Sequence, residues 1–91
     1  MPQDVQEVYG PLALTASGIV ISGAGGALGG FLCTTAGSLK LSYSSDGSGA
    51  TIVDTVAVTA GIFLPLPFAF GPGQVVYATL TGGAKGTFAV L

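Results

Sequence analysis

Several short segments of the chain alternate apolar and polar residues. Residues 38–44 place an apolar side chain at every second position, and residues 55–59 and 87–90 repeat the pattern over shorter stretches. Successive side chains of a strand point to opposite faces of its sheet, so this alternation is typical of strands with one buried face. We predict three half-buried strands from these segments.

Apolar runs between turn-prone clusters extend the pattern to the rest of the chain. They cover residues 12–14, 18–22, 30–34, 62–64 and 74–80. Successive candidates are about 8–12 residues apart, a rhythm typical of sandwiches and small barrels. No segment carries a capped apolar stripe of helical period. The predicted fold class is therefore all-β, a small antiparallel β-sandwich that is jelly-roll-like.

The faces of the predicted strands also predict the core. Two sheets packed face to face bury one face of each strand. The side chains that we expect in the core are Leu39, Leu41, Tyr43, Val56, Val58, Phe63, Val76, Leu80, Phe88 and Val90.

The beginning of the chain differs from the rest. Residues 1–11 hold two of the four acids and two prolines, Pro2 and Pro11, with no alternation before Leu12. We predict an extended N-terminal arm over residues 1–11 and a single β-sandwich domain over residues 12–91. Such arms often become ordered only when something ties them down.

Two segments indicate the edges of sheets. Pro65 and Pro67 cannot donate hydrogen bonds to a strand ladder, so residues 64–70 must run at an edge or outside the sheets. Their large apolar side chains either close the core between the sheets or make a contact between subunits. Asp54 interrupts an otherwise apolar strand, which favours a protected sheet edge over an ion pair with a lysine.

Charge is scarce, and this restricts the classes of partner. Only 7% of the residues are charged, against about 25% in ordinary domains. The basic residues are Lys40 and Lys85 alone, too few to neutralise a nucleic-acid backbone. No stretch approaches the roughly 18 apolar residues of a membrane-spanning helix. A surface of hydroxyls and glycine backbone desolvates few ions when it is covered, which favours a protein packed against other proteins.

The residues that usually carry catalysis or bind metals are missing. Without histidine, no Ser–His or Cys–His pair can activate a nucleophile, and the single thiol of Cys33 cannot supply the ligands of a zinc site. Cys33 lies in an apolar run and is expected in the core. We therefore expect no enzymatic activity, no catalytic residues, no cofactor and no bound metal. The N-terminus lacks the features of a signal peptide, which predicts a protein used without secretion.

Two glycine-containing segments have simpler explanations than ligand binding. Residues 22–29 follow an apolar strand, as a dinucleotide-binding loop does, but the third glycine position of that motif is Leu28 and no helical segment follows. A turn between strands is the prediction. Asp46, in a run of serine and glycine, is expected to bond the backbone of its own turn.

A resemblance to a known group of proteins rests on four segments: residues 29–41, 46–49, 60–61 and 82–90. Over about residues 29–91 the chain resembles small glycine-rich β-sandwich proteins encoded in the head-gene region of tailed bacteriophages. The resemblance implies a capsid decoration or cement protein, present in many copies on the outer capsid surface of the virion and bridging major capsid proteins. It implies synthesis in the host cytoplasm and no individual site residues.

The hypothesis is thus a non-enzymatic virion structural protein that binds the major capsid protein and itself, as a homo-oligomer that could be a dimer or a trimer. The alternative is a fibre- or tail-associated receptor- or carbohydrate-binding module, a use to which small β-sandwiches are also put. The protein-interface residues that we expect are Tyr9, Pro11, Phe63, Pro65, Pro67, Phe68 and Phe70.

Overall fold

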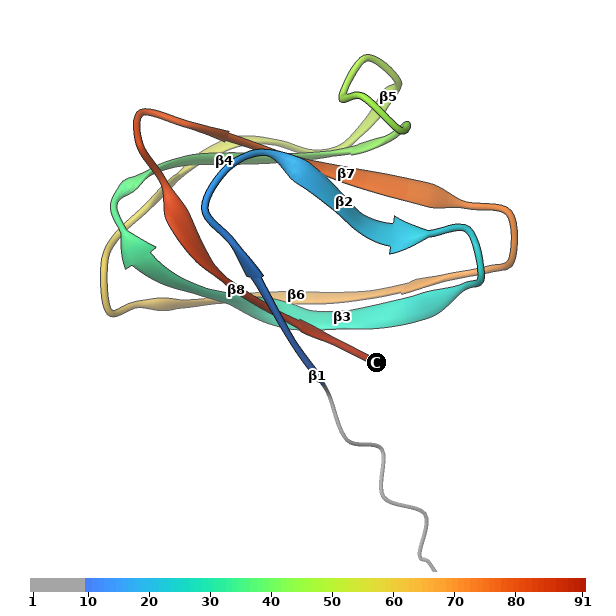
Figure 1. Cartoon of the computed structure of the whole chain (residues 1–91), viewed down its shortest axis with the longest axis horizontal. Helices are drawn as coiled ribbons and strands as arrows, with labels where there is room; N and C mark the ends of the chain where they lie inside the picture. Colours follow the sequence, from blue (N-terminus) through green and yellow to red (C-terminus); the bar gives the residue numbers. More distant parts are fainter. Residues whose placement is uncertain (1–9) are drawn as a thin grey trace, which may run out of the picture.

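Residues 10–91, the part of the chain that the computed structural model describes, contain eight antiparallel β-strands (Figure 1). No helix in these residues is long and apolar enough to cross a membrane. The strands are β1 (Gly10–Leu14), β2 (Gly18–Ser22), β3 (Gly26–Thr35), β4 (Gly37–Tyr43), β5 (Ala50–Val58), β6 (Phe63–Phe70), β7 (Val75–Thr81) and β8 (Lys85–Val90). Each of the eight predicted segments overlaps a strand of its own.

The strands form two four-stranded sheets, and the prediction of an all-β antiparallel sandwich is confirmed. The first sheet has the order β1-β8-β3-β6 and the second the order β2-β7-β4-β5. Pairing is nested: β1 pairs with β8, β2 with β7, β3 with β6 and β4 with β5. These pairs fall alternately in the first and second sheets, and the sheets lie as two layers in Figure 1.

The predicted arm lies mostly outside the described residues, as does Tyr9. The two remaining arm positions, Gly10 and Pro11, instead begin β1, where they pair with Val90 and Ala89 of β8. The first strand therefore starts two residues before the predicted domain boundary.

The core lies between the inner faces of the two sheets. Five of the ten expected core residues are buried, namely Leu39, Leu41, Val58, Val76 and Phe88. Three more, Val56, Leu80 and Val90, are partly buried and pack against this cluster. The expected burial of Cys33 is confirmed as well, at 1% exposed.

Two of the core predictions are wrong. Phe63 is 50% exposed and Tyr43 is 41% exposed. Phe63 begins β6, whose inward positions are taken by the residues that alternate with it, from Leu64 to Phe70. Tyr43 ends β4 and sets its ring edge-on against Phe70, with ring centroids 6.0 Å apart, so only part of the ring is covered.

Both edge predictions are confirmed. β6, with Pro65 and Pro67, is the outer strand of the first sheet, and β5, with Asp54, is the outer strand of the second. The glycine-rich turn is shorter than predicted, because Gly26 already starts β3; Gly23 and Gly25 take positive φ angles of 105° and 81° in the turn itself.

The turn role of Asp46 is confirmed and leads to a prediction. Its Oδ1 accepts hydrogen bonds from the Ser48 hydroxyl (2.6 Å) and the Ser48 backbone N–H (3.0 Å), and these bonds lower the pKa of the Asp46 carboxyl. The hydroxyl makes the larger contribution, so Ser48→Ala should raise this pKa toward its ordinary value. Carboxyl-carbon NMR titration measures the shift, with Asp54 as the internal control; an unchanged Asp46 would contradict the prediction.

Candidate functional site

The central part of the outward side of the first sheet is almost entirely apolar. Strand pairing places its residues in two rows across β1, β8, β3 and β6. The first row is Pro11, Ala89, Gly30 and Pro65, and the second is Ala13, Thr87, Leu32 and Phe63. Pro67 follows Pro65 at the next outward position of β6. We call these nine residues the outer apolar face.

Leu32 and Phe63 stand out from this face as a ridge. They are cross-strand partners, and they are 45% and 50% exposed. The Phe63 ring lies over Gly30, because a Cβ on Gly30 would come 2.7 Å from Phe63 Cε2 and as close to the backbone of Leu64. An aromatic ring that covers a glycine on the neighbouring strand shields backbone that would otherwise be bare. The lack of a side chain at Gly30 thereby leaves the space that the Phe63 ring occupies.

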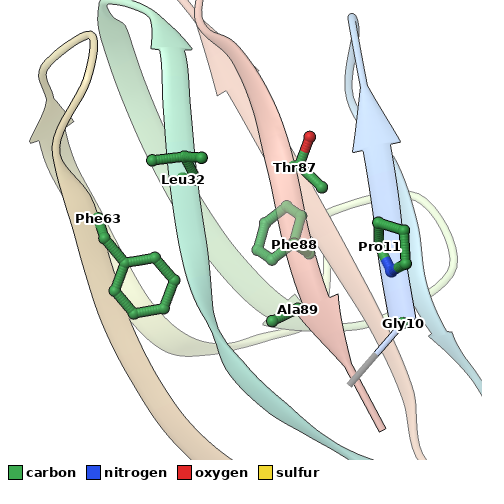
Figure 2. A pocket seen from close by; sticks show the side chains of 7 residues that line it. All are labelled: Gly10, Pro11, Leu32, Phe63, Thr87, Phe88 and Ala89. Carbon is green, nitrogen blue, oxygen red and sulfur yellow. The ribbon is translucent and has the colours of Figure 1, made fainter. Parts of the chain in front are cut away.

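A groove of about 240 Å³ runs beside the ridge (Figure 2). Its walls come from Pro11 on β1 and from Leu32 and Phe63 on β3 and β6, with the short side chains of Ala89 and Thr87 on β8 between them. Gly10 and the backbone side of Phe88 complete the lining. Only Thr87 contributes a polar side chain, so the groove suits an apolar occupant.

No charged side chain lines the groove, and the charged residues of the described part of the chain lie elsewhere. Lys40 and Asp54 belong to the second sheet, Asp46 to the β4–β5 turn, and Lys85 to the far end of β8, where it pairs with Thr35. The outward side of the second sheet is polar by contrast, with Ser38 and Lys40 opposite threonines of β7. The sandwich therefore has two unlike faces, one apolar and one rich in hydroxyl groups.

The outer apolar face brings together four of the seven interface residues expected from the sequence. Pro11 and Phe63 line the groove, and Pro65 and Pro67 share the face. Phe68 and Phe70 point the other way: Phe68 packs against the core, and Phe70 is part of it at 6% exposed. Their placement follows from the alternation of side chains along β6. The sequence does not show this alternation, because residues 64–70 are apolar on both faces of the strand.

Five residues of the face were missed by sequence reasoning: Ala13, Gly30, Leu32, Thr87 and Ala89. Leu32 lies in the run Gly30-Phe31-Leu32-Cys33, where an unbroken apolar pattern does not show which side chain points outward. Thr87 and Ala89 were assigned to a solvent face. The pairing of β3 with β8 sets them beside Leu32 and makes them part of an apolar surface.

A second groove, of about 440 Å³, lies where the β4–β5 and β6–β7 turns approach each other. Tyr43, Ser44, Ser45, Gly73, Gln74 and Val75 line it. Two of its polar groups are used inside the turns: Ser44 Oγ accepts a bond from the Gly47 N–H and Gln74 Oε1 one from the Gly71 N–H, each at 2.7 Å. In residues 10–91, no three histidine, cysteine, aspartate or glutamate side chains gather as a metal site requires.

Comparisons of the whole chain with protein-family models, with curated proteins and with solved structures found no match.

Proposed function

We propose that the chain is a non-enzymatic structural protein of a virion: a decoration or cement protein that sits on the outer capsid surface, binds the major capsid protein and itself, and stabilises the shell. The observation that carries the proposal is the outer apolar face, with Leu32 and Phe63 half-exposed beside an uncharged groove. Contiguous apolar surface on a small domain marks a place where another protein docks.

The energetics of such a face support adhesion. Covering the exposed half of a large apolar side chain contributes on the order of 1 kcal/mol, and aromatic anchors dominate many interfaces. No charged side chain lines the groove, so docking would not have to strip water from an ion. Many equivalent copies on a symmetric shell would add such modest contacts into stable attachment.

The strand order supports the finer part of the proposed fold, a jelly roll. A long hairpin whose strands 1–4 lie against strands 8–5, rolled up so that successive pairs alternate between two layers, produces the nested pairing seen here. Eight-stranded jelly rolls are common in viral capsid proteins and in lectins. The likeness is one of architecture, and it supports a capsid role.

The second groove favours one alternative, a receptor- or carbohydrate-binding module at a fibre or tail. Tyr43 is 41% exposed there and could stack on a sugar ring. The engagement of Ser44 and Gln74 within their own turns leaves few free groups to read sugar hydroxyls. A glycan array separates the readings, since a decoration protein should bind none of the glycans.

Shells that carry the chain should survive denaturant or heat better than matched shells that lack it. Binding at a hundredfold excess over the dissociation constant stabilises the bound state by about 2.7 kcal/mol per site. The measurement compares the melting of depleted shells before and after addition of the purified full-length chain, with a heat-denatured sample of the chain as control. Equal melting in all three samples would count against a cement role.

A further inference from the structure

We infer that the outer apolar face docks onto the same face of a second copy of this chain, so that the unit of attachment is a two-fold symmetric dimer. The inference deepens the proposed adhesive function and rests on it, since it names the occupant of the proposed adhesive face. Four properties of the described residues carry it: charge, shape, area and the condition of the sheet edges.

The absence of charge suits a self-contact. A two-fold axis brings each group near the axis close to its own copy, so a charged face would meet like charge and be repelled. The groove lining holds no charged side chain, and Lys85, on the same sheet, lies beyond Thr87 at the end of β8. Nothing in the centre of the face therefore opposes pairing with itself.

The shape of the face is self-complementary. The ridge of Leu32 and Phe63 runs beside the groove over Thr87 and Ala89, as Figure 2 shows. A two-fold axis that lies in the plane of the contact, along the strand direction and between ridge and groove, places each ridge in the groove of the other copy. The walls of the groove stand on β1 and β3, which flank β8 and so are about 10 Å apart, wide enough for a leucine or phenylalanine side chain.

The area is close to what a specific dimer needs. Four strands at about 4.8 Å spacing make a sheet about 19 Å wide, and its strands of five to ten residues have a mean length of about 24 Å. Each copy then covers about 450 Å², or about 900 Å² in total, just below the lower limit of about 1,000 Å² for specific interfaces. We therefore expect a reversible dimer with a dissociation constant in the micromolar range.

The sheet edges discourage the other common route to self-association, strand addition. Pro11 lies in the edge strand β1, Pro65 and Pro67 lie in the edge strand β6, and Asp54 lies in the edge strand β5. The remaining edge strand, β2, has a register shift in its pairing with β7. Prolines, inward or edge charges and bulges are the features that block edge-to-edge pairing. Faces, and not edges, are left to associate.

A two-fold dimer also fits the proposed cement role. It carries each remaining surface twice, in opposite directions about the axis, so one dimer can hold two neighbouring capsid subunits at once. Two linked attachments hold far more tightly than either alone.

Sedimentation equilibrium of the purified full-length chain tests the inference. The wild-type chain should dimerise in the micromolar range, and added salt should not weaken the dimer because no ions are paired across the contact. Phe63→Asp should weaken dimerisation by about a hundredfold or more, since it places a charge in an apolar contact. Thr79→Asp, on the outward side of the second sheet, is the matched control and should dimerise like wild type. Circular dichroism verifies that each variant is folded.

A charge-pair experiment tests the ridge-in-groove geometry itself. Ala89→Lys alone should be monomeric like Phe63→Asp, but an equimolar mixture of the two should form a heterodimer, because each aspartate then faces a lysine of the other copy.

The inference is overturned by a chain that stays monomeric at all concentrations, by a trimer or larger species, by a Phe63→Asp variant that dimerises like wild type, or by a mixture that shows no heterodimer. The shell-melting measurement keeps the test of the dimer separate from the test of the proposed function. A monomer that protects shells refutes the dimer alone, and a dimer that leaves them unprotected refutes the cement role alone.

Discussion

Phe88→Ala is expected to lower the free energy of unfolding by about 3–5 kcal/mol. Phe88 is fully buried and lies on β8, between β1 and β3 in the middle of the first sheet. Its cross-strand partner is Phe31, also fully buried, with ring centroids 4.7 Å apart at an angle of 49°. Truncation removes the Phe88 ring, one of the two rings of this pair. It leaves a cavity that the neighbouring strands cannot fill, because their backbone hydrogen bonds hold them in place.

The loss is large against the whole stability of the domain, which for most proteins is only about 5–15 kcal/mol. Urea unfolding followed by circular dichroism should show a midpoint lower by about 1–5 M with an unchanged slope. Ile62→Ala is the control, because Ile62 is also large and apolar but is 59% exposed; its cost should stay below about 1 kcal/mol. Similar losses for the two variants would mean that the Phe31–Phe88 pair is not the centre of the core.

The strands and the sheet edges could be predicted from the sequence because they depend on local chemistry. Alternation in residues 38–44 reflects one buried and one exposed face, and Leu39 and Leu41 are indeed fully buried. Proline has no N–H group to donate to a neighbouring strand at any position in a fold. Pro65 and Pro67 therefore indicated an edge strand without knowledge of the topology.

Prediction of the faces failed where the local pattern breaks. Leu28 and Phe31 are three residues apart, yet both are buried, because the register of β3 shifts between Leu28 and Gly30. A strict two-residue period cannot place both of them inside. Phe63 was expected in the core because it is a phenylalanine, but its position at the start of β6 puts it on the outward side, over Gly30.

The candidate site was only half predictable for a related reason. Pro11 and Phe63 are 52 positions apart in the sequence and lie on one groove only because β8 pairs with both β1 and β3, and β3 pairs in turn with β6. Which small residues, such as Ala89, lie between them depends on that long-range pairing. Composition alone indicated an adhesive surface, and topology alone locates it.

Gly86→Ala is expected to lower the free energy of unfolding by about 1–3 kcal/mol although it adds a single methyl group. Gly86 lies on the inner side of β8 and pairs with Cys33 of β3. A Cβ there would run into the carbonyl oxygen of Leu32 and into the Phe31 ring, 2.7 Å from Cε1. Its φ angle is not positive, so the whole effect is steric: the Phe31 ring and the Leu32 carbonyl oxygen occupy the space that a side chain of residue 86 would need.

The same chemical change at Gly71 is the control, because a Cβ there meets only Gln74 Oε1, at 3.8 Å. Gly71→Ala should leave stability unchanged or raise it slightly, since alanine reduces the freedom of the unfolded chain. Combining Gly86→Ala with Phe31→Leu should cost less than the sum of the two single changes, because the smaller side chain makes room for the new methyl group. Additive losses in urea unfolding would show that the contact with the Leu32 carbonyl oxygen, and not the contact with the Phe31 ring, sets the cost of the new methyl group.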